Sequence, residues 1–402
     1  MRRSSKIVVV SQHYAPDSST TAIFMTSIAE HLALDFPVTV FSGWNGSAAA
    51  ASEGPGRPRI VEIRNWMPAK AALVKRATAE LLFSMRVFIV LLMRLRPGDV
   101  VLTVTAPFML PYSVAAAAWL RRARSVLILH DLFPDVLVMS GLMRPRSMAA
   151  MAIHGANALM YRALSAVIVI GRDTTRLLRR YKAVTPEKIC FIPNWATLPV
   201  GLRPVEPDNR FRRLCKRRFV VGLSGNLGFT HDPLVVFEAA RMLREADDIG
   251  FLLSGWGTGF ERLRALQAGA RLPNVTLMDR VGETDLAEFL ASADLWIIPY
   301  RNNAAGVSVP SRFYNLLAIG RPVAIVSEAS AEAAVAIREH DIGWVVPPGD
   351  PAELAAAIRS AASPGVARAK GERAVAVAGQ YSFEQAMTSY RNLVHRLLKN
   401  PA

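Results

Sequence analysis

Two serines and an arginine near residue 310 have the types and spacing of an anion-binding site. Ser308, Ser311 and Arg312 follow a stretch of small and polar residues, and Pro310 and Ser311 are typical helix start signals. A helix N-terminus offers free N–H groups and a positive dipole end, and a guanidinium there adds a charge-assisted donor. The stretch predicts a phosphate or diphosphate site, although an ordinary crossover with a solvated Arg312 fits the spacing equally well.

Glycine-rich loops could bring backbone close to the same kind of ligand. The run Gly225-Asn226-Leu227-Gly228 follows an apolar stretch, and Gly255 and Gly257 follow another. Glycine lets a backbone approach a diphosphate closely at the carboxyl end of a strand. A tight turn without a ligand explains these glycines nearly as well.

The first half of the chain has polar groups of its own after apolar runs. His130 and Asp131 follow one run. A second set follows the first run: His13, Tyr14, Asp17, Ser19, Thr20 and Thr21. These residues could contact a ligand, but a buried histidine with satisfied hydrogen bonds and simple helix capping remain alternatives.

The elements that must position these groups alternate between strand and helix. In the first half strands are predicted at 7–10, 38–41, 59–64, 99–104, 125–129, 166–170 and 190–193. In the second half they are predicted at 219–224, 250–254, 275–278, 295–299, 322–326 and 343–346. Helices are predicted at 18–34, 111–121, 233–246, 260–270, 285–291, 351–362 and 383–398. Repeated units of this kind predict an α/β protein with doubly wound parallel sheets.

The length and a change of composition indicate two domains facing a cleft. A chain of 402 residues is too long for one ordinary core, and residues 199–216 are rich in proline and charge. We therefore expect a first domain at 1–198, a linker at 199–216, a second domain at 217–380 and a final helix within 381–402.

The amino-acid composition indicates which kinds of partner the protein could bind. Hydrophobic residues at 51% and charged residues at 20% describe a folded protein. The formal charge of +16 favours nucleic acid, an anionic membrane or phosphorylated substrates. Cys190 and Cys215 have no metal-type spacing, so neither a zinc site nor a disulfide framework is expected, and a cytosolic compartment fits best.

A basic helix near residues 71–96 bears on the membrane question. Stretches 81–95 and 148–170 are interrupted by polar or charged residues and should not span a bilayer. The helix could lie on an anionic surface, or it could face the core and expose a basic side. Its apolar residues at helical spacing are Leu73, Val74, Ala77, Leu81, Leu82, Met85, Phe88 and Ile89. Basic residues lack the interleaved aromatics of nucleic-acid surfaces, so nucleic acid is not expected.

Several segments carry a resemblance to a known family. They are GNLGFTHDP, GWGTG, ASADLWIIPY and VPSRFYNLLAIGRPVAIV in the second half, and ILHDLFPDVLVMSG and KICFIPNW in the first. Together they resemble the family-4 retaining glycosyltransferases of GT-B fold, most of all those that build bacterial exopolysaccharide. The resemblance covers nearly the whole chain. It implies that the second domain binds a nucleotide sugar, that the first binds the acceptor, and that the last helix crosses back to the first domain.

The resemblance also implies roles for single residues. Arg312, His130 and Asp131 would act at the reacting sugar, with Arg312 stabilising the leaving diphosphate. The donor site would comprise Gly225, Asn226, Gly228, His231, Gly255, Gly257, Arg280, Val281, Ser308, Ser311, Arg312, Tyr314 and Asn315. The acceptor site would comprise His13, Tyr14, Asp17, Thr20, Thr21 and Asp135. Without an Asp-x-Asp element, we expect neither a metal nor a cofactor.

Two departures from the family pattern matter for the site. Many members carry two glutamates eight positions apart, where this chain has Val307 and Asn315. Relatives place an arginine or lysine soon after the glycine loop, so cationic help there would fall to His231 or be missing. Asp294, just before a strand, is expected to be structural.

The function implied is transfer of a sugar from a nucleotide diphosphate sugar to an acceptor with retention of configuration. The acceptor expected is a saccharide linked to undecaprenyl diphosphate, at the inner face of the cytoplasmic membrane. A nucleotide-sugar epimerase of the same architecture, or a non-catalytic partner subunit, remains an alternative.

Overall fold

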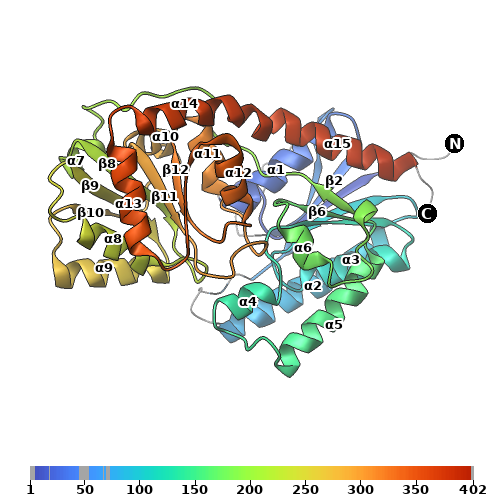
Figure 1. Cartoon of the computed structure of the whole chain (residues 1–402). Helices are drawn as coiled ribbons and strands as arrows, with labels where there is room; N and C mark the ends of the chain where they lie inside the picture. The colour runs from blue at the N-terminus through green and yellow to red at the C-terminus, as the bar shows by residue number, and fades with distance from the viewer. Residues whose placement is uncertain (1–4, 18, 45–53, 67, 69–72, 400–402) are drawn as a thin grey trace. The chain divides into compact units, whose positions relative to one another are not determined.

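The structure, a computed structural model, describes residues 5–17, 19–44, 54–66, 68 and 73–399. The chain divides into two compact units, each with its own parallel sheet (Figure 1). Unit 1 comprises residues 1–134, 144–193 and 384–402, and unit 2 comprises residues 135–143 and 194–383. The prediction of two doubly wound sheets is confirmed.

Unit 1 is built on a seven-stranded parallel sheet in the order β3-β2-β1-β4-β5-β6-β7. β1, β4 and β5 are buried along their whole length, as expected of unbroken apolar runs. The strand order reverses at β1 and β4, and ligands of such sheets lie near the carboxyl ends of strands at this point. The strands are β1 (Ile7–Ser11), β2 (Val38–Trp44), β3 (Arg59–Arg64), β4 (Val100–Val104), β5 (Arg124–Leu129), β6 (Ala166–Val169) and β7 (Ile189–Phe191).

Helices connect the strands of unit 1. They are α1 (Thr20–Ala33), α2 (Leu73–Arg94), α3 (Leu110–Leu120), α5 (Met148–Ala163), α6 (Thr174–Leu178) and the short η1 (Pro186–Lys188). Residues 148–170, tested above as a membrane segment, are α5 followed by β6. The last helix, α15 (Phe383–Lys399), contacts the segment just after α1, where Arg391 pairs with Asp35 at 2.6 Å and His395 packs edge-on against Phe36.

Helix α2 has apolar residues on two different sides. Phe83, Val87 and Leu91 are fully buried in a core shared with α3. Leu81, Met85, Ile89 and Met93 repeat every four residues on another side, where they are 46% to 68% exposed. The helix therefore does face the core, as the alternative held, but through Phe83, Val87 and Leu91, and it exposes a second apolar side. Within the described residues, no helix is long and apolar enough to cross a membrane.

Unit 2 contains a six-stranded parallel sheet in the order β10-β9-β8-β11-β12-β13. The strands are β8 (Phe219–Asn226), β9 (Ile249–Trp256), β10 (Val275–Met278), β11 (Leu295–Pro299), β12 (Val323–Val326) and β13 (Gly343–Val346). The helices are α4 (Asp135–Met139), α7 (Arg212–Cys215), α8 (Pro233–Met242), α9 (Thr258–Ala270), α10 (Leu286–Ala291), α11 (Ser311–Ala318), α12 (Glu332–His340), α13 (Pro351–Ala362), α14 (Val366–Ala378) and η2 (Gly379–Tyr381).

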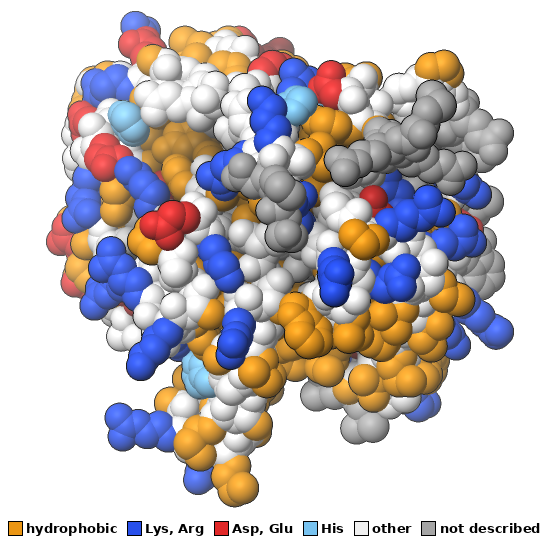
Figure 2. Space-filling model, turned by 90° about the vertical axis from the view of Figure 1, so that its right-hand side faces the viewer, with side chains coloured by type: hydrophobic (Ala, Val, Ile, Leu, Met, Phe, Trp, Pro, Cys, Tyr) orange, Lys and Arg blue, Asp and Glu red, His pale blue; other side chains and the backbone are white. Residues whose placement is uncertain are grey.

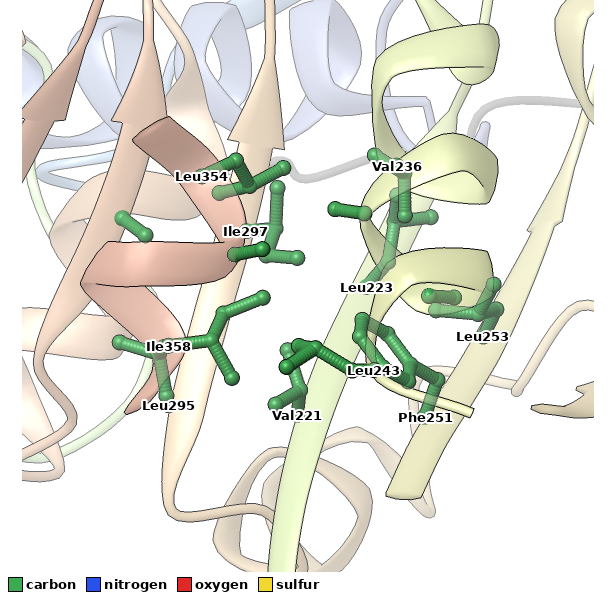
Figure 3. Close-up of a cluster of buried hydrophobic side chains, with 14 of the residues drawn as sticks. Val221, Leu223, Val236, Leu243, Phe251, Leu253, Leu295, Ile297, Leu354 and Ile358 are labelled. Atoms are coloured by element: carbon green, nitrogen blue, oxygen red, sulfur yellow. The ribbon is translucent and has the colours of Figure 1, made fainter. Parts of the chain in front are cut away.

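The core of unit 2 lies between its sheet and helices α8 and α13 (Figure 3). Val221 and Leu223 of β8 and Ile297 of β11 meet Val236 of α8 and Leu354 of α13 in this core, and all five are at most 3% exposed. Burial of such side chains contributes roughly 1.5–3 kcal/mol each. This packing fixes the strand ends from which the candidate site is built.

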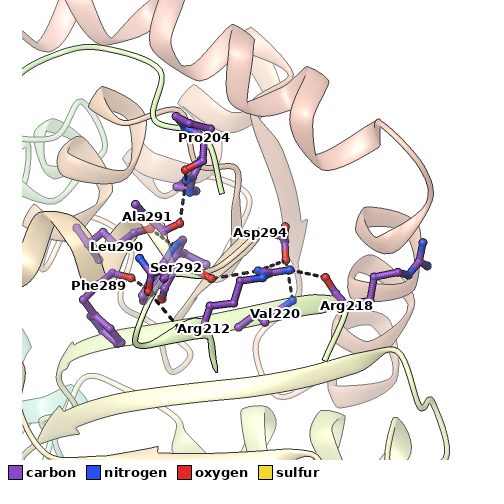
Figure 4. A network of polar contacts seen from close by, with 12 residues as sticks. Pro204, Arg212, Arg218, Val220, Phe289, Leu290, Ala291, Ser292 and Asp294 are labelled. Carbon is purple, nitrogen blue, oxygen red and sulfur yellow. Dashed lines mark hydrogen bonds and ion pairs between the residues drawn. The ribbon is translucent and has the colours of Figure 1, made fainter. Parts of the chain in front are cut away.

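The segment predicted as a linker is instead fixed to unit 2. Backbone N–H groups of Gly201 and Arg203 donate to carbonyls of Ala318 and Ile319, and α7 lies in the same segment. Arg212 donates at 2.8 Å to Asp294, which also accepts the Val220 N–H at 2.7 Å (Figure 4). Asp294 is therefore structural, as expected. After the short segment 135–143, the chain passes from unit 1 into the main part of unit 2 between Pro193 and Asn194.

Candidate functional site

The predicted anion-binding residues lie at the point of unit 2 where the strand order reverses. β8 lies between β9 and β11 in the sheet. The connection after β8 leads to β9 on one side, whereas the connection after β11 leads to β12 on the other side. The glycine run closes β8, and the segment that leads into α11 follows β11. A crevice at the carboxyl ends of such strands is the general ligand site of doubly wound sheets.

Arg312 stands in the first turn of α11 without a bonded partner. Its guanidinium makes no hydrogen bond or ion pair with any described residue. Burial lowers its pKa, while Glu283 raises that pKa and Arg280 lowers it further. No side chain caps the first turn of α11, whose N-cap residue is Pro310. The turn therefore offers a largely desolvated cation together with backbone donors, as an anion site requires.

A second guanidinium lies close enough to influence Arg312. The guanidinium carbon of Arg280 is 4.5 Å from the centre of the Trp256 ring, so the arginine stacks on the side chain that ends β9. Trp256 and Glu283 were not among the predicted site residues. Trp256 lies between the two predicted glycines, and Glu283 follows Val281 and Gly282, so their place in the sequence could have drawn attention to them.

The glycines of the predicted loops fall into two kinds. Gly225 has a φ of +136° with no atom within 4 Å of an added Cβ, and Gly228 has only the Asn226 amide at 3.7 Å. Backbone is thus accessible at both. A Cβ on Gly255 would lie 2.4 Å from the Gly225 carbonyl oxygen, and one on Gly257 would lie 2.4 Å from Asn226 Oδ1. Close packing between the two loops explains Gly255 and Gly257 without a ligand.

His231 does not supply the positive charge expected of it. Burial, with a smaller contribution from the charge of Arg301, lowers its pKa to about 4. The ring stacks on Tyr300 at 4.9 Å, and its Nδ1 lies 3.0 Å from the Thr230 hydroxyl. The imidazole is therefore neutral at neutral pH and can act only as a neutral hydrogen-bonding group.

Tyr314 and Asn315 are both buried and contact other parts of unit 2. Tyr314 is 1% exposed and packs on Tyr381 at 5.3 Å. The Asn315 side-chain oxygen accepts the backbone N–H groups of Thr197 at 2.7 Å and Leu198 at 3.3 Å. Tyr314, two residues after Arg312, lies on the opposite side of the helix, whereas Asn315 shares the face of Arg312 but is held by the 197–198 segment. We correct their predicted donor-binding role to a structural one. Val307 is 5% exposed.

An unpredicted glutamate shapes the loop before α11. Glu328 follows β12, and its carboxylate accepts the backbone N–H groups of Asn303 and, at 3.3 Å, Ala305. Asn303 and Gly306 in this loop have positive φ values of 65° and 76°. Glu328 thus positions the loop that leads to Ser308 and Ser311, both of which are partly exposed.

In unit 1 several predicted residues gather around the carboxyl ends of β1, β4 and β5. His13 Nδ1 lies 2.6 Å from Asp17 Oδ2, and the Ser19 N–H donates to Asp17 Oδ1 at 2.8 Å. Burial favours a higher pKa for Asp17, but these hydrogen bonds outweigh it and the pKa is lowered. The Thr105 hydroxyl accepts the backbone N–H groups of His130 and Asp131 at 3.3 and 3.2 Å. It thereby links the end of β4 to the end of β5.

His130 and Asp131 have shifted pKa values of opposite sense. Burial lowers the pKa of His130 to about 4 and raises that of Asp131 to about 6. His130 is therefore neutral at neutral pH, whereas Asp131 holds its proton to a higher pH than an exposed carboxyl. Groups perturbed in this way at strand ends are candidates for a functional site.

The remaining predicted acceptor residues are placed differently from one another. Tyr14 is 5% exposed, and its hydroxyl makes no hydrogen bond to a described residue. Ser19 caps α1 through the Ala22 N–H, so Thr20 and Thr21 begin the helix and neither is its cap. Asp135 is the first residue of α4 in unit 2. Among the described residues, no three or more His, Cys, Asp and Glu side chains form a group suited to a metal ion.

Comparison with known proteins links this geometry to an enzyme family. Residues 218–363 match the family described as glycosyl transferases group 1, and residues 20–195 match the glycosyl transferase 4-like domain. The chain is 27% identical over 288 residues to WbjE of Pseudomonas aeruginosa, described as a glycosyltransferase, covering 71% of this chain and 72% of WbjE.

Two further proteins resemble it over greater lengths. WcaI of Escherichia coli K12, described as a colanic acid biosynthesis glycosyl transferase, is 24% identical over 346 residues, which are 81% of this chain and 84% of WcaI. The structure of HepE from Anabaena, solved with UDP and glucose, superimposes with a TM-score of 0.68 at 18% identity, covering 98% of this chain and 100% of HepE. With its two doubly wound sheets, the chain belongs to the family-4 glycosyltransferases of GT-B fold.

Proposed function

We propose that this chain is a retaining glycosyltransferase that moves a sugar from a nucleotide diphosphate sugar to a lipid-linked saccharide in bacterial exopolysaccharide or cell-surface glycan synthesis. The observation that carries the donor assignment is Arg312, a largely buried cation with no bonded partner, beside Arg280 at an uncapped helix start. Many other arginines of unit 2 are paired with carboxylates, such as Arg212 with Asp294 and Arg218 with Asp248. A doubly charged diphosphate would supply the missing partner.

The accessible backbone of the glycine loop completes the proposed donor site. Gly225 and Gly228 leave open space at the carboxyl end of β8, and Ser308 and Ser311 border the start of α11. Arg280 on Trp256, with Val281 beside it, would border the nucleoside. The HepE complex holds UDP and glucose, which supports a nucleotide sugar as the ligand proposed here.

The proposed reaction needs positioning and charge neutralisation more than a protein acid or base. The acceptor hydroxyl oxygen forms a bond to the anomeric carbon while the bond from that carbon to the diphosphate oxygen breaks. The electron pair stays on the diphosphate, which takes the acceptor proton on the same face. Arg312, already desolvated, stabilises the charge that develops there, and neutral His130 can hydrogen-bond a sugar hydroxyl.

The charge of the chain supports an anionic acceptor or surface for unit 1. Unit 1 contains 27 Lys and Arg against 11 Asp and Glu, which is a net +16, whereas unit 2 contains 21 of each and is neutral. The whole excess of the chain therefore belongs to unit 1. We propose that unit 1 binds a saccharide carried on undecaprenyl diphosphate and holds the enzyme at the inner face of the cytoplasmic membrane.

Ligand-dependent thermal stability tests the donor site directly. The purified protein is heated with UDP-, GDP-, ADP- and dTDP-sugars in the presence of a chelator, beside its Arg312→Ala variant. We expect one nucleotide to raise the melting temperature of the wild type and to have no effect on the variant. A rise that requires added divalent ions would contradict a metal-independent diphosphate site.

The same preparation separates the proposed transfer from epimerisation. With the stabilising nucleotide sugar alone, a transferase leaves the sugar configuration unchanged, whereas an epimerase converts it without an acceptor. If no nucleotide stabilises the protein, the chain is a non-catalytic partner and the proposal fails.

A further inference from the structure

Unit 1 has an apolar groove between α3 and α5, apart from the strand ends that carry the candidate residues. The groove encloses about 630 Å³, within the range of small-molecule sites. Small side chains leave the space between the two helices: Ala115 and Ala116 on α3, and Ala156 and Ala163 on α5. Trp119 and Leu159 line it while remaining 68% and 72% exposed.

Tyr112 is the tyrosine that lines the groove, and its hydroxyl already forms a hydrogen bond. The Tyr112 hydroxyl donates to the Asn157 side-chain oxygen at 2.6 Å, and the Asn157 amide donates to the Phe133 carbonyl at 2.7 Å and the Tyr181 hydroxyl at 3.0 Å. The ring of Tyr112 is thus an apolar part of the groove, so a hydrocarbon suits the lining better than a sugar or a nucleotide.

The groove continues into a wider exposed apolar surface on neighbouring helices. α3 packs on both α2 and α5, so the three helices form one layer. Figure 2 shows hydrophobic side chains gathered in the lower part of one face, with Lys and Arg side chains beside them. The exposed apolar residues of the layer are Leu81, Leu82, Met85, Ile89 and Met93 on α2, Trp119 and Leu120 on α3, and Met148, Met151 and Leu159 on α5. Contiguous apolar surface of this kind marks an interaction site.

The basic residues around the groove indicate what kind of partner binds there. Arg162 lines the groove, and its guanidinium has no bonded partner among the described residues. Arg121 and Arg122 follow the last residue of α3, and Lys188 donates to the last carbonyls of α5. A second copy of the chain would bring another unit of charge +16, whereas a bilayer with anionic headgroups offers hydrocarbon and negative charge together.

We propose that the α3–α5 groove receives a hydrocarbon chain of an anionic membrane lipid while the exposed side of α2 lies in the same interface. This proposal rests on the membrane association proposed above and names the surface that achieves it. Burying a chain in the groove adds apolar contact that charge alone would not provide, and Arg162 would pair with the headgroup.

Quenching of Trp119 fluorescence by brominated lipid chains tests the groove. Vesicles of phosphatidylglycerol and phosphatidylcholine with brominated acyl chains are added to the full chain, and Trp119 emission is obtained by difference from Trp119→Phe. We expect strong quenching on these vesicles and little on phosphatidylcholine alone. Arg162→Ala should weaken vesicle binding about fivefold, since one basic residue near the surface contributes that much.

Matched variants distinguish the groove from the surrounding surface. Ala156→Phe fills the groove from α5 and should reduce Trp119 quenching roughly twofold or more, and Ala116→Phe should do the same from α3. Ala158→Phe adds the same ring to an exposed position of α5 that does not line the groove, so quenching should persist. Two independent filling variants keep the test valid if one of them misfolds.

Three results would overturn the proposal. They are vesicle binding without quenching of Trp119, equal quenching in the filled and control variants, and no vesicle binding by a chain that forms dimers disrupted by Ala156→Phe. The last would identify a second copy as the occupant. Nucleotide-dependent stabilisation, measured without vesicles, reports on unit 2 alone, so failure of the donor site is distinguishable from failure of the groove.

Discussion

The guanidinium of Arg312 is largely desolvated, and its N–H groups bond to no described residue. Such a buried charge is energetically unfavourable unless an anion binds there. The guanidinium can form two parallel hydrogen bonds to a diphosphate, and its charge is felt more strongly in a site that excludes water. Glu283 partly balances it, and Arg280 opposes it. The residue is thus prepared for negative charge before a ligand arrives, which is the condition for electrostatic stabilisation of a leaving group.

Replacing Arg312 should therefore weaken both binding of the donor and stabilisation of the leaving diphosphate. We expect Arg312→Ala to lower kcat/KM by about 10²–10³. Arg312→Lys should recover only part of the loss, because an ammonium lacks the planar fork of the guanidinium. Steady-state kinetics with the stabilising nucleotide sugar measures both. Arg359→Ala removes an exposed arginine from α13 and serves as the control, and an equal loss there would contradict a specific role for Arg312.

His231 should make unit 2 less stable in acid. Its pKa is about 4 in the folded protein and near 6.5 when unfolded, so the unfolded state takes up the proton first. The resulting stability is complete above pH 6.5 and is lost as the pH falls toward 4, by about 3 kcal/mol. His130 acts in the same direction. Asp131, with a raised pKa, gains its proton first in the folded state and opposes them.

Urea unfolding at pH 7 and pH 4.5 measures this difference. His231→Gln should lose less stability between the two pH values than the wild type does, even if it is less stable at pH 7. An unchanged difference would show that His231 is accessible to protons in the folded state.

The charge of His231 illustrates what single residues in a sequence cannot reveal. Its position just after the glycine loop suggested that it could contact a phosphate. Its protonation depends on burial and on stacking with Tyr300, which is distant in sequence. The partners of Asn315 at Thr197 and Leu198 are likewise more than a hundred residues away.

At the scale of elements, the glycine loop at the end of β8 contains two glycines with different roles. The backbone conformation favours glycine at one position, and a ligand could approach at the other. Gly225 has a φ of +136°, which other residues rarely adopt, although the space around its Cα is open. Gly228 has ordinary backbone geometry and nearly open space. The two positions therefore form a matched pair within one turn.

Alanine at each position should have a different effect. Gly225→Ala should reduce the free energy of unfolding by roughly 1–2 kcal/mol, because a Cβ strains that conformation. Gly228→Ala should leave stability within about 0.5 kcal/mol of the wild type but weaken nucleotide-sugar binding, since its methyl group occupies the space proposed for the diphosphate. Urea unfolding and calorimetric titration measure the two effects. Unchanged affinity in Gly228→Ala would place the diphosphate elsewhere.

The helices and strands could be predicted where strongly apolar residues stand out clearly from polar ones. The buried strands follow from unbroken apolar runs such as Ile7–Val10 and Leu295–Pro299, and each is a strand in the structure. α12 and α14 were not predicted, because alanine makes up much of their sequence and gives little contrast between their sides. In α2 the apolar period was recognised, but periodicity cannot say which of two apolar sides meets the core.

At the scale of the whole molecule, charge and chemistry are divided between the units. Unit 2 is neutral overall yet keeps Arg312 largely buried, whereas the net +16 of unit 1 is carried mostly by exposed arginine and lysine side chains. Sequence composition gave the total charge but not this division. Exposed charges act over a distance set by salt, about 10 Å at 0.1 M and 3 Å at 1 M, while buried charges are screened much less.

This division predicts that salt should separate the two kinds of binding. Raising NaCl from about 50 mM to about 500 mM should release the full chain from phosphatidylglycerol vesicles, because the attraction of unit 1 is screened. Over the same range the Kd for the nucleotide sugar should change less than roughly threefold, because the guanidinium that holds the diphosphate is desolvated. Flotation and calorimetric titration on one preparation measure both. If the two affinities fall in parallel, surface charge and not the Arg312 site holds the nucleotide. If vesicle binding survives high salt, apolar contact through α2, α3 and α5 outweighs the charge of unit 1.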